Sequence, residues 1–302
     1  MPGDSAMTIR FDNRVAIVTG AGNGLGRAHA LLLASRGAKV VVNDPGGARD
    51  GRGGDSAVAD KVVAEIKAAG GQAVANYDSV AEQKAAANIV KTAVDAFGTV
   101  DIVVNNAGIL RDKSFPNMSM DDFLLILQVH LMGSVYVTHA AWPILREKAY
   151  GRIVLTSSSS GLYGNFGQTN YSAAKLSLVG FMNTLRLEGQ KYNILVNSLA
   201  PVAGTRMTED LMPAELIARM KPELVSPMVA YLCSEACTRS GEIWAAGVGY
   251  FSRVEFREGP GVRVAGQPTI EDVAANIDKI ADLTTSTAYR TANEESQAVL
   301  AG

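Results

Sequence analysis

Short apolar runs alternate along the chain with longer stretches in which apolar residues recur at every third or fourth position. The short runs have the length of buried β-strands, and the longer stretches have the period of helices. The expected strands are Val15–Val18, Lys39–Asn43, residues 72–80, Val100–Val104, Arg152–Leu155 and Asn193–Leu199. Because strands and helices take turns from Val15 to about Ala246, we predict an α/β fold with a doubly wound parallel sheet flanked by helices.

A single domain followed by an extension accounts for this pattern. The 302 residues, 47% of them hydrophobic, are enough to bury one large core. We assign residues 1–252 to that domain and residues 253–302 to a C-terminal extension, because the composition becomes looser after the last expected strand.

The extension carries one recognisable helix signal. Thr269 and Asp272 have the spacing of a helix cap, and an apolar stripe begins at Ile270, so we expect one helix near residues 269–283. Its apolar face could dock on its own domain or on a neighbouring subunit. The polar end beyond Thr284 has no stripe, which is typical of a disordered segment.

Charge and composition exclude several classes of protein. A net charge of −2 and a pI near 6.0 provide neither a basic stripe for nucleic acid nor a polybasic patch for a membrane. Neither a signal peptide nor an apolar stretch long enough to cross a membrane is apparent, and the last residues are not a peroxisomal tripeptide. We expect a cytoplasmic protein whose partners are small molecules or copies of itself.

The cysteines and histidines indicate no metal site. Cys233 and Cys237 are too few for a structural zinc site, and we expect packed, free thiols. The three histidines do not cluster with cysteines or carboxylates, so we predict no catalytic metal.

A glycine-rich turn between the first expected strand and the helix at about Leu25–Arg36 predicts a nucleotide site. The Gly-x-x-x-Gly-x-Gly spacing allows a tight turn, close approach of the backbone to a pyrophosphate, and packing of the helix start on the sheet. The free N–H groups of the helix start then face the phosphates. The predicted cofactor-binding residues of this turn are Gly20, Asn23, Gly24, Leu25 and Gly26.

Asp44 ends the second expected strand, about twenty residues beyond that turn. A carboxylate there can accept hydrogen bonds from both adenosine ribose hydroxyls and would repel a 2′-phosphate, which predicts NAD rather than NADP as the cofactor. Arg49 and Arg52, in the glycine-dense loop that follows, could instead bind a 2′-phosphate or could be solvated loop charges.

Tyr171 and Lys175 are the candidate catalytic pair. On a helix, residues four apart lie on one face, so the Lys175 ammonium is expected beside the Tyr171 phenol, where it favours the ionised form. A phenol in that state can take a proton from an alcohol. Four consecutive serines, residues 157–160, precede this helix and would ordinarily indicate a flexible loop; Ser158 lies thirteen positions before Tyr171.

The motifs TGAGNGLG and NNAG (Asn105–Gly108), together with Ser158, Tyr171 and Lys175, resemble the short-chain dehydrogenase/reductase superfamily, which has a Rossmann-type fold. Within it, VVNDPGG, VVNNAGILRD, YGRIVLTSSSSGLYGNFGQTNYSAAK and NSLAPVAGTRMT resemble one branch. This branch is the (3R)-hydroxyacyl-CoA dehydrogenase unit of type 2 multifunctional enzymes (17-beta-hydroxysteroid dehydrogenase type 4) and its bacterial single-domain relatives. The likeness covers about residues 10–283. Because the superfamily's serine lies about thirteen residues before its tyrosine, the resemblance implies Ser158 as the catalytic serine, with Ser157 as the runner-up.

The resemblance implies further cofactor contacts. Asp78 and Ser79 would flank the adenine ring. From the sequence alone, the same two residues equally predict an N-cap for the next helix. The NNAG segment would lie against the cofactor ribose, and the loop after the sixth strand would reach the carboxamide. The residues concerned are Asn105, Ala107, Gly108, Val202 and Thr205.

Other positions are less settled. His130 stands where most members of the superfamily have an asparagine that helps a proton relay, and it is either a substitute for it or a core residue. The stretch 207–225, rich in methionine and proline, is expected to be a mobile helical lid or a plain crossover. The apolar helix that begins at Tyr171 predicts a homodimer or homotetramer.

The predicted function is therefore NAD-dependent oxidation of a secondary alcohol. The resemblance implies a (3R)-hydroxyacyl-CoA as the substrate, within β-oxidation of fatty acids or of a steroid side chain, with the hydratase and the thiolase as separate proteins. The alternatives are a 17β-hydroxysteroid dehydrogenase, an NADPH-dependent 3-oxoacyl reductase, which Asp44 disfavours, and a non-catalytic scaffold that senses NAD.

Overall fold

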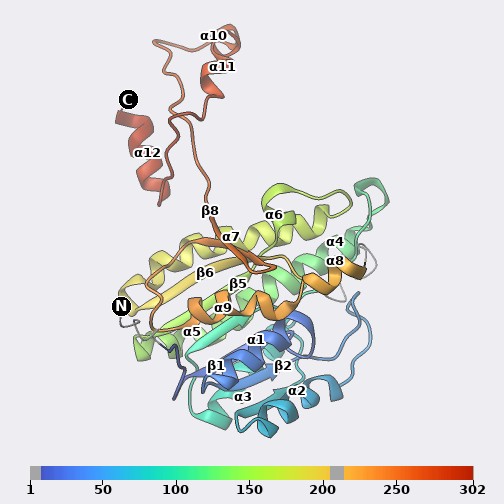
Figure 1. Ribbon diagram of the computed structural model, residues 1–302. Helices are drawn as coiled ribbons and strands as arrows, with labels where there is room; N and C mark the ends of the chain where they lie inside the picture. The colour runs from blue at the N-terminus through green and yellow to red at the C-terminus, as the bar shows by residue number, and fades with distance from the viewer. Residues whose placement is uncertain (1–7, 205–213, 302) are drawn as a thin grey trace, which may run out of the picture. The chain divides into compact units, whose positions relative to one another are not determined.

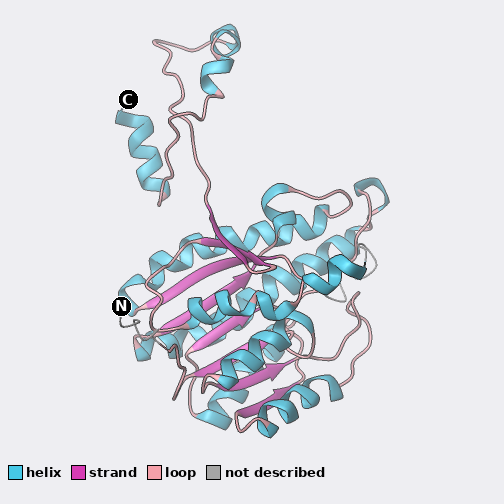
Figure 2. Ribbon diagram, in the orientation of Figure 1, coloured by secondary structure: helices cyan, strands magenta, loops and turns pink. Residues whose placement is uncertain are grey.

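The computed structural model describes residues 8–204 and 214–301 and is built on one eight-stranded sheet (Figures 1 and 2). The strand order is β3-β2-β1-β4-β5-β6-β7-β8, and the strands from β1 to β7 pair in parallel. The strands are β1 (Val15–Thr19), β2 (Lys39–Asn43), β3 (Gln72–Asn76), β4 (Ile102–Asn105), β5 (Gly151–Thr156), β6 (Ile194–Pro201), β7 (Ile243–Gly247) and β8 (Tyr250–Val254). The predicted doubly wound α/β fold is confirmed.

Strand β1 pairs with β2 on one side and with β4 on the other, so the chain order reverses beside it. In open parallel sheets such a reversal leaves a crevice at the carboxyl ends of the strands, where ligands bind. The glycine turn after β1 and the segment after β4 both begin at this point. The topology therefore brings together two motifs of the expected nucleotide site that lie far apart in the sequence.

Helices cover both faces of the sheet (Figure 1). Helices α1, α2 and α9 pack together, while α3 packs against α5, and α7 packs on β6. The helices of this domain are α1 (Gly24–Ser35), α2 (Ala57–Ala68), α3 (Gln83–Phe97), α4 (Met120–Leu127), α5 (Gly133–Lys148), α6 (Ser159–Tyr163), α7 (Thr169–Gly189), α8 (Ala214–Arg219) and α9 (Ser226–Cys233). Short 3₁₀ turns are η1 (Phe115–Asn117), η3 (Gln190–Tyr192) and η5 (Pro222–Leu224), and η2 (Gln128–Met132) is a π-helical turn.

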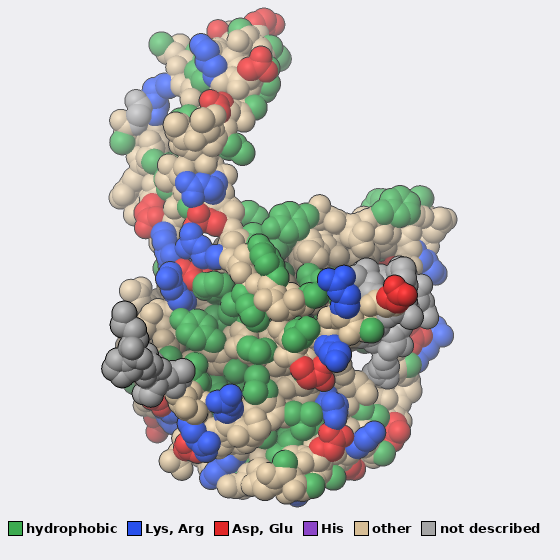
Figure 3. Space-filling model, viewed as in Figure 1, with side chains coloured by type: hydrophobic (Ala, Val, Ile, Leu, Met, Phe, Trp, Pro, Cys, Tyr) green, Lys and Arg blue, Asp and Glu red, His purple; other side chains and the backbone are tan. Residues whose placement is uncertain are grey.

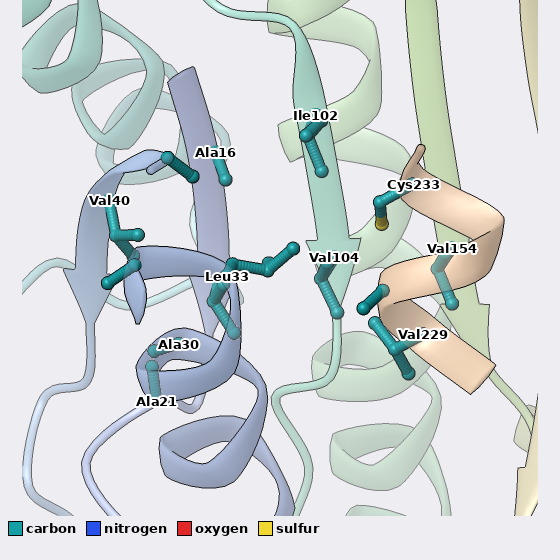
Figure 4. Close-up of a cluster of buried hydrophobic side chains, with 14 of the residues drawn as sticks. Ala16, Ala21, Ala30, Leu33, Val40, Ile102, Val104, Val154, Val229 and Cys233 are labelled. Carbon is teal, nitrogen blue, oxygen red and sulfur yellow. The ribbon is translucent and has the colours of Figure 1, made fainter. Parts of the chain in front are cut away.

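The core between the sheet and helices α1 and α9 is built from small and β-branched side chains (Figure 4). Strands buried on both faces need continuous apolar runs, which explains why the strand segments do not alternate with polar residues. Leu33 reaches the sheet from α1, and Val229 and Cys233 reach it from α9. Cys233 and Cys237 are buried free thiols, as expected.

Helix α4, turn η2 and helix α5 form one continuous run, Met120–Lys148, of 29 residues. By length and composition alone this run could cross a membrane, so the expectation that no stretch of the chain is long and apolar enough was wrong. A single such helix is weak evidence for a membrane span, because core helices pass the same test. Here Ile126, Val137 and Leu145 are fully buried against the protein, and α5 packs on α3.

Residues 254–302 form a second compact unit, separate from residues 1–253. The single helix expected near 269–283 is instead two short helices, α10 (Ile270–Ala275) and α11 (Ile277–Ile280). The break falls at Asn276, whose side-chain amide donates to the Asp272 carbonyl at 2.8 Å and so competes with the regular helical bonds. The expected capping box of Thr269 and Asp272 is present.

A further helix, α12 (Ala292–Ala301), lies in the polar end that was expected to be disordered. Thr291 accepts a hydrogen bond from the Glu294 N–H at 3.1 Å, and the Glu294 carboxylate accepts one from the Arg290 N–H at 2.7 Å. This Thr-x-x-Glu cap is a start signal that the sequence contains but that a search for apolar stripes misses. Helices α10, α11 and α12 have no buried residue.

Candidate active site

A cavity of about 510 Å³ opens at the carboxyl ends of the strands. Its walls come from the segments that follow β1, β2, β4, β5 and β6, and from the start of α7. The predicted site residues that line it are Gly20, Asn23, Gly24, Leu25, Asp44, Gly108, Ser158, Tyr171, Lys175 and Val202. Residues that sequence reasoning did not select also line it, among them Thr156 and Gln168. The candidate nucleotide turn and the candidate catalytic residues thus share one cavity.

The glycines of the nucleotide turn are required by close backbone contacts. Gly20 has a positive φ of +62°, and a Cβ on it would lie 2.8 Å from the Ala107 Cα. A Cβ on Gly26 would lie 2.2 Å from the Gly20 carbonyl oxygen. Both approaches are shorter than real Cβ contacts, so side chains there would push the turn away from the sheet. Gly26 does not itself line the cavity but holds the turn that does.

Gly22 is a constrained glycine that sequence analysis missed. A Cβ on it would lie 2.4 Å from Val58 Cγ1 and 2.8 Å from Asp44 Oδ2. No spacing rule could have identified it, because Val58 belongs to α2 and reaches the turn only through the fold. The Gly22 N–H also donates to Asp44 Oδ2 at 2.8 Å, so this glycine positions the predicted ribose-binding carboxylate.

Asp44 is oriented by two backbone donors. Its Oδ2 accepts from Gly22, and its Oδ1 accepts from the Gly46 N–H at 2.7 Å, which holds the half-buried carboxylate at the cavity wall. Each oxygen keeps a lone pair that a ribose hydroxyl could use. Arg52, the alternative phosphate ligand, is 79% exposed and lies 3.6 Å from Asp50. Neither Arg52 nor Arg49 lines the cavity.

The two candidate serines have different hydrogen bonds. The Ser157 hydroxyl is buried and donates to the Lys175 carbonyl at 2.8 Å, which ties β5 to α7. Ser158 caps α6 by accepting from the Ser160 N–H at 3.2 Å, and it also hydrogen-bonds the Tyr171 phenol. Ser158 is therefore the serine in contact with the candidate proton acceptor.

Lys175 is 3% exposed, and its ammonium donates to the Thr156 carbonyl at 2.6 Å. It lies 5.5 Å from the centre of the Tyr171 ring. Burial lowers the pKa of Lys175 to about 7, because a charged ammonium is poorly solvated there. The predicted neighbourhood of phenol and ammonium is present.

The predicted electrostatic effect on Tyr171 is not present in the protein without cofactor. Desolvation at the cavity wall raises the pKa of Tyr171 to about 12, the hydrogen bond from Ser158 opposes that rise, and the Asp112 charge adds to it. The expectation that Lys175 alone would favour the phenolate was wrong because burial penalises the charged form of both residues. A positive charge supplied with the cofactor would act against this penalty.

His130 lies on the π-helical turn η2 and is 1% exposed. Its Nε2 is 3.1 Å from the Ile109 amide nitrogen and 2.9 Å from the Ile109 carbonyl oxygen, and its ring meets the Tyr171 ring edge-on at 5.2 Å. Burial, with a smaller effect from the Lys175 charge, lowers the pKa of His130 well below its usual value. The imidazole is therefore uncharged near neutral pH and packs in the wall of the cavity.

The remaining predicted residues do not line the cavity. Asp78 accepts hydrogen bonds from Asn76 and Asn88 at 2.7 and 2.6 Å, and the Ser79 hydroxyl accepts from the Ala81 N–H at 3.2 Å. Both therefore stabilise the start of the segment that leads into α3.

Asn105 and Ala107 support the strand end after β4. The Asn105 amide donates to the Thr138 hydroxyl at 3.0 Å, and the Ala107 N–H donates to the Thr19 hydroxyl at 3.1 Å. Thr205 lies outside the described residues, as does much of the expected lid.

The cavity fits a nicotinamide dinucleotide. Glycines leave room at the turn where a Cβ would collide, Asp44 offers two oriented acceptors, and the Thr156 hydroxyl is buried without a hydrogen-bond partner among the described residues. Across residues 8–204 and 214–301, no group of three His, Cys, Asp or Glu side chains could hold a metal ion. Figure 3 shows basic and acidic side chains mixed on the visible face, with no basic stripe.

Known proteins share this sequence and fold. The short chain dehydrogenase family model matches residues 14–216. A short-chain type dehydrogenase/reductase of Mycobacterium tuberculosis is 56% identical over 271 residues, which are 90% of this chain and 95% of that protein. The peroxisomal multifunctional enzyme type 2 of Mus musculus is 51% identical over 298 residues, which are 98% of this chain but 40% of that protein.

The structure of full-length peroxisomal multifunctional enzyme type 2 from Drosophila melanogaster matches with a TM-score of 0.82 at 40% identity. That match covers 97% of this chain and 50% of the other. The chain thus spans half or less of the length of these multifunctional relatives. The family match, the relatives and the fold agree, and the chain belongs to the short-chain dehydrogenase family, whose members are oxidoreductases that bind a nicotinamide cofactor.

Proposed function

We propose that this protein oxidises a secondary alcohol with NAD, and that its substrate is a (3R)-hydroxyacyl-CoA, which becomes the 3-oxoacyl-CoA. The observation that carries the proposal is the meeting of Ser158, Tyr171 and Lys175 with the glycine turn and Asp44 in one cavity. A scaffold that only sensed NAD would not need a hydrogen-bonded serine and tyrosine next to a buried lysine.

Each polar group has a separate task in this reaction. Tyr171 takes the proton of the substrate hydroxyl, and Ser158, already hydrogen-bonded to the phenol, also binds the substrate oxygen. Lys175, held by the Thr156 carbonyl, binds the nicotinamide ribose and places a positive charge beside Tyr171. A bound nicotinamide would supply the acceptor for the hydride of the carbinol carbon, and its positive ring would favour the phenolate of Tyr171.

NAD is proposed over NADP because Asp44 occupies the wall where the adenosine ribose would lie, with both carboxylate oxygens already oriented. A 2′-phosphate would place negative charge against that carboxylate. In the variant Asp44→Ala, activity with NAD should fall and activity with NADP should rise. An unchanged preference would contradict the ribose assignment.

The acyl-CoA substrate is supported by the similarity to the relatives named above, which include peroxisomal multifunctional enzymes type 2. This chain spans only part of the length of those proteins. The cytoplasmic location and the homodimeric or homotetrameric assembly stay predictions, and light scattering after gel filtration would measure the assembly.

The experiment that tests the function follows NADH formation with (3R)- and (3S)-hydroxyacyl-CoA and with 17β-estradiol, in the protein and in Tyr171→Phe. Turnover of the R isomer that disappears in the variant supports the proposal. If the protein oxidises only the steroid, the acyl-CoA assignment is wrong and a 17β-hydroxysteroid is the substrate. If NAD binds tightly but no substrate is oxidised, the protein is an NAD sensor and not an enzyme.

A further inference from the structure

The helix that carries Tyr171, α7, begins without a bond from its N-cap side chain. The N-cap residue is Gln168, and its side chain forms no capping hydrogen bond. That amide is engaged elsewhere, because Nε2 donates to the Asp112 carboxylate at 2.6 Å and Oε1 accepts from the Asn165 amide at 3.0 Å. Tyr171 is the third residue of the helix, where a backbone N–H has no acceptor within the helix. Another group must therefore hold this first turn.

Asn170 is that group. It has no exposed surface, and its Oδ1 accepts a hydrogen bond from the Tyr171 N–H at 2.7 Å. Its Nδ2 donates to the Arg111 carbonyl at 3.1 Å. Because an N–H only donates and a carbonyl only accepts, the two partners also fix which way the amide points. One buried side chain thus joins the backbone of Tyr171 to the segment that follows β4.

The segment that follows β4, residues 109–113, is a firm anchor for this bond. The Arg111 side chain donates from Nε to the Asp50 carbonyl at 3.0 Å and pairs with the Asp122 carboxylate at 2.7 Å. These bonds tie the segment to the loop after β2 and to helix α4. The anchor is therefore held by elements other than α7.

Lys175, one turn further along α7, is held by different neighbours. Its ammonium donates to the Thr156 carbonyl at 2.6 Å, and its own carbonyl accepts from the Ser157 hydroxyl at 2.8 Å. Both partners belong to β5 or follow it directly. Loosening the first turn of α7 should therefore displace the phenol of Tyr171 and leave the lysine in place.

We propose that Asn170 is a positioning residue for Tyr171, because its buried amide holds the first turn of α7 against Arg111 and so keeps the phenol where it can reach the substrate hydroxyl. The proposal rests on the proposed role of Tyr171 as proton acceptor. Proton transfer needs the two oxygens within hydrogen-bond reach, and a misplacement of about 1 Å can cost about a hundredfold in rate. Asn170 carries no charge and does not line the cavity, so it acts through geometry alone.

The test compares Asn170→Ala with a matched control, Asn197→Ala in β6. Asn197 is 1% exposed, its Nδ2 donates to the Arg239 carbonyl at 2.8 Å, and its Oδ1 accepts from the Glu242 N–H at 3.2 Å. It does not line the cavity either. Both variants remove a buried amide that bridges two backbone groups, so both should lose similar stability in urea unfolding.

Only Asn170→Ala should lower kcat, by about tenfold to about a hundredfold. Its Kd for NAD, measured by calorimetry, should stay unchanged, because Lys175 and the glycine turn keep their places. A purely structural role would lower stability in both variants and kcat in neither.

A second measurement needs no substrate. Amide hydrogen exchange at Tyr171 is followed in the NAD complex, where loss of the acceptor should accelerate exchange about fivefold in Asn170→Ala and leave it unchanged in Asn197→Ala. If Asn170→Ala does not fold, Asn170→Ser replaces it. The serine hydroxyl can reach one partner but cannot span both, so exchange and kcat should shift in the same directions by smaller factors.

An unchanged kcat in Asn170→Ala would overturn the positioning role, as would an equal loss of kcat in Asn197→Ala. Unchanged exchange at Tyr171, or a loss of NAD affinity as large as the loss of kcat, would overturn it too. If the unmodified protein oxidises no hydroxyacyl-CoA, the substrate assignment fails, and the exchange at Tyr171 still decides whether Asn170 holds the turn.

Discussion

Acidification should destabilise this protein through one buried histidine. His29 on α1 has no exposed surface, its Nδ1 lies 2.8 Å from the Ser226 hydroxyl, and its Nε2 has no hydrogen-bond partner among the described residues. Burial lowers the pKa of His29 from 6.5 to about 3. The folded protein therefore keeps this imidazole neutral at pH values where the unfolded chain protonates it.

The sign and size of the effect follow from linkage. Because the unfolded state binds more protons below pH 6.5, the free energy of unfolding falls as the pH decreases from 6.5 towards 3. With these two pKa values, His29 costs about 2 kcal/mol at about pH 5 relative to neutral pH, and the slope approaches about 1.4 kcal/mol per pH unit below that. Stability linked to His29 is fully present above pH 6.5.

Urea unfolding at about pH 7.5 and about pH 5 measures this loss. The variant His29→Asn can still accept a hydrogen bond from Ser226 but does not titrate, so its loss between the two pH values should be smaller by about 2 kcal/mol. His139→Asn makes the same substitution at an exposed histidine and is the matched control. If His29→Asn loses as much stability on acidification as the unmodified protein, the linkage argument is refuted.

Three further predictions follow from contacts described above. Gly22→Ala should weaken NAD binding, measured by calorimetry, about tenfold, because the added Cβ would collide with Val58. Adding Val58→Ala to the same protein removes that collision and should restore much of the affinity. Ser158→Ala should lower kcat by about a hundredfold or more, whereas Ser157→Ala should keep most of kcat and lose about 1 kcal/mol of stability in urea unfolding. Asp101→Asn should lower the free energy of unfolding by about 3 kcal/mol. The fully buried carboxylate forms ion pairs with Arg14 and Lys148 and accepts a hydrogen bond from the Val15 N–H. A loss below about 1 kcal/mol in urea unfolding would contradict that reasoning.

The sequence predicts those parts of the site that depend on local spacing. The glycine turn, Asp44 at the end of β2, and the pair of Tyr171 and Lys175 on one helix face are set by the chain within one βα unit or one helical turn. The parallel pairing also follows, because apolar runs separated by helices favour parallel strands with crossovers, whereas the strand order is known only from the structure. The cap of α12 was readable as well, since Thr291 and Glu294 are three residues apart.

Features that depend on contacts between distant segments could not be predicted. Gly22 is constrained by Val58 of another helix, and the hydrogen bond from the buried Ser157 hydroxyl to the Lys175 carbonyl likewise joins segments that only the fold brings together. Spacing showed that Lys175 would stand beside Tyr171, but not that both would be buried deeply enough for desolvation to dominate.

That burial changes how the proton acceptor must work. Burial raises the pKa of Tyr171 to about 12 and lowers the pKa of Lys175 to about 7, so these two side chains by themselves are poorly suited to accept a proton at neutral pH. The low-dielectric wall that causes this also strengthens any charge that enters the cavity. The positive nicotinamide would therefore favour the phenolate form of Tyr171. The negative charge of that phenolate would in turn favour the protonated form of Lys175. In the proposed oxidation, Tyr171 would therefore take up the substrate proton only with the oxidised cofactor in place.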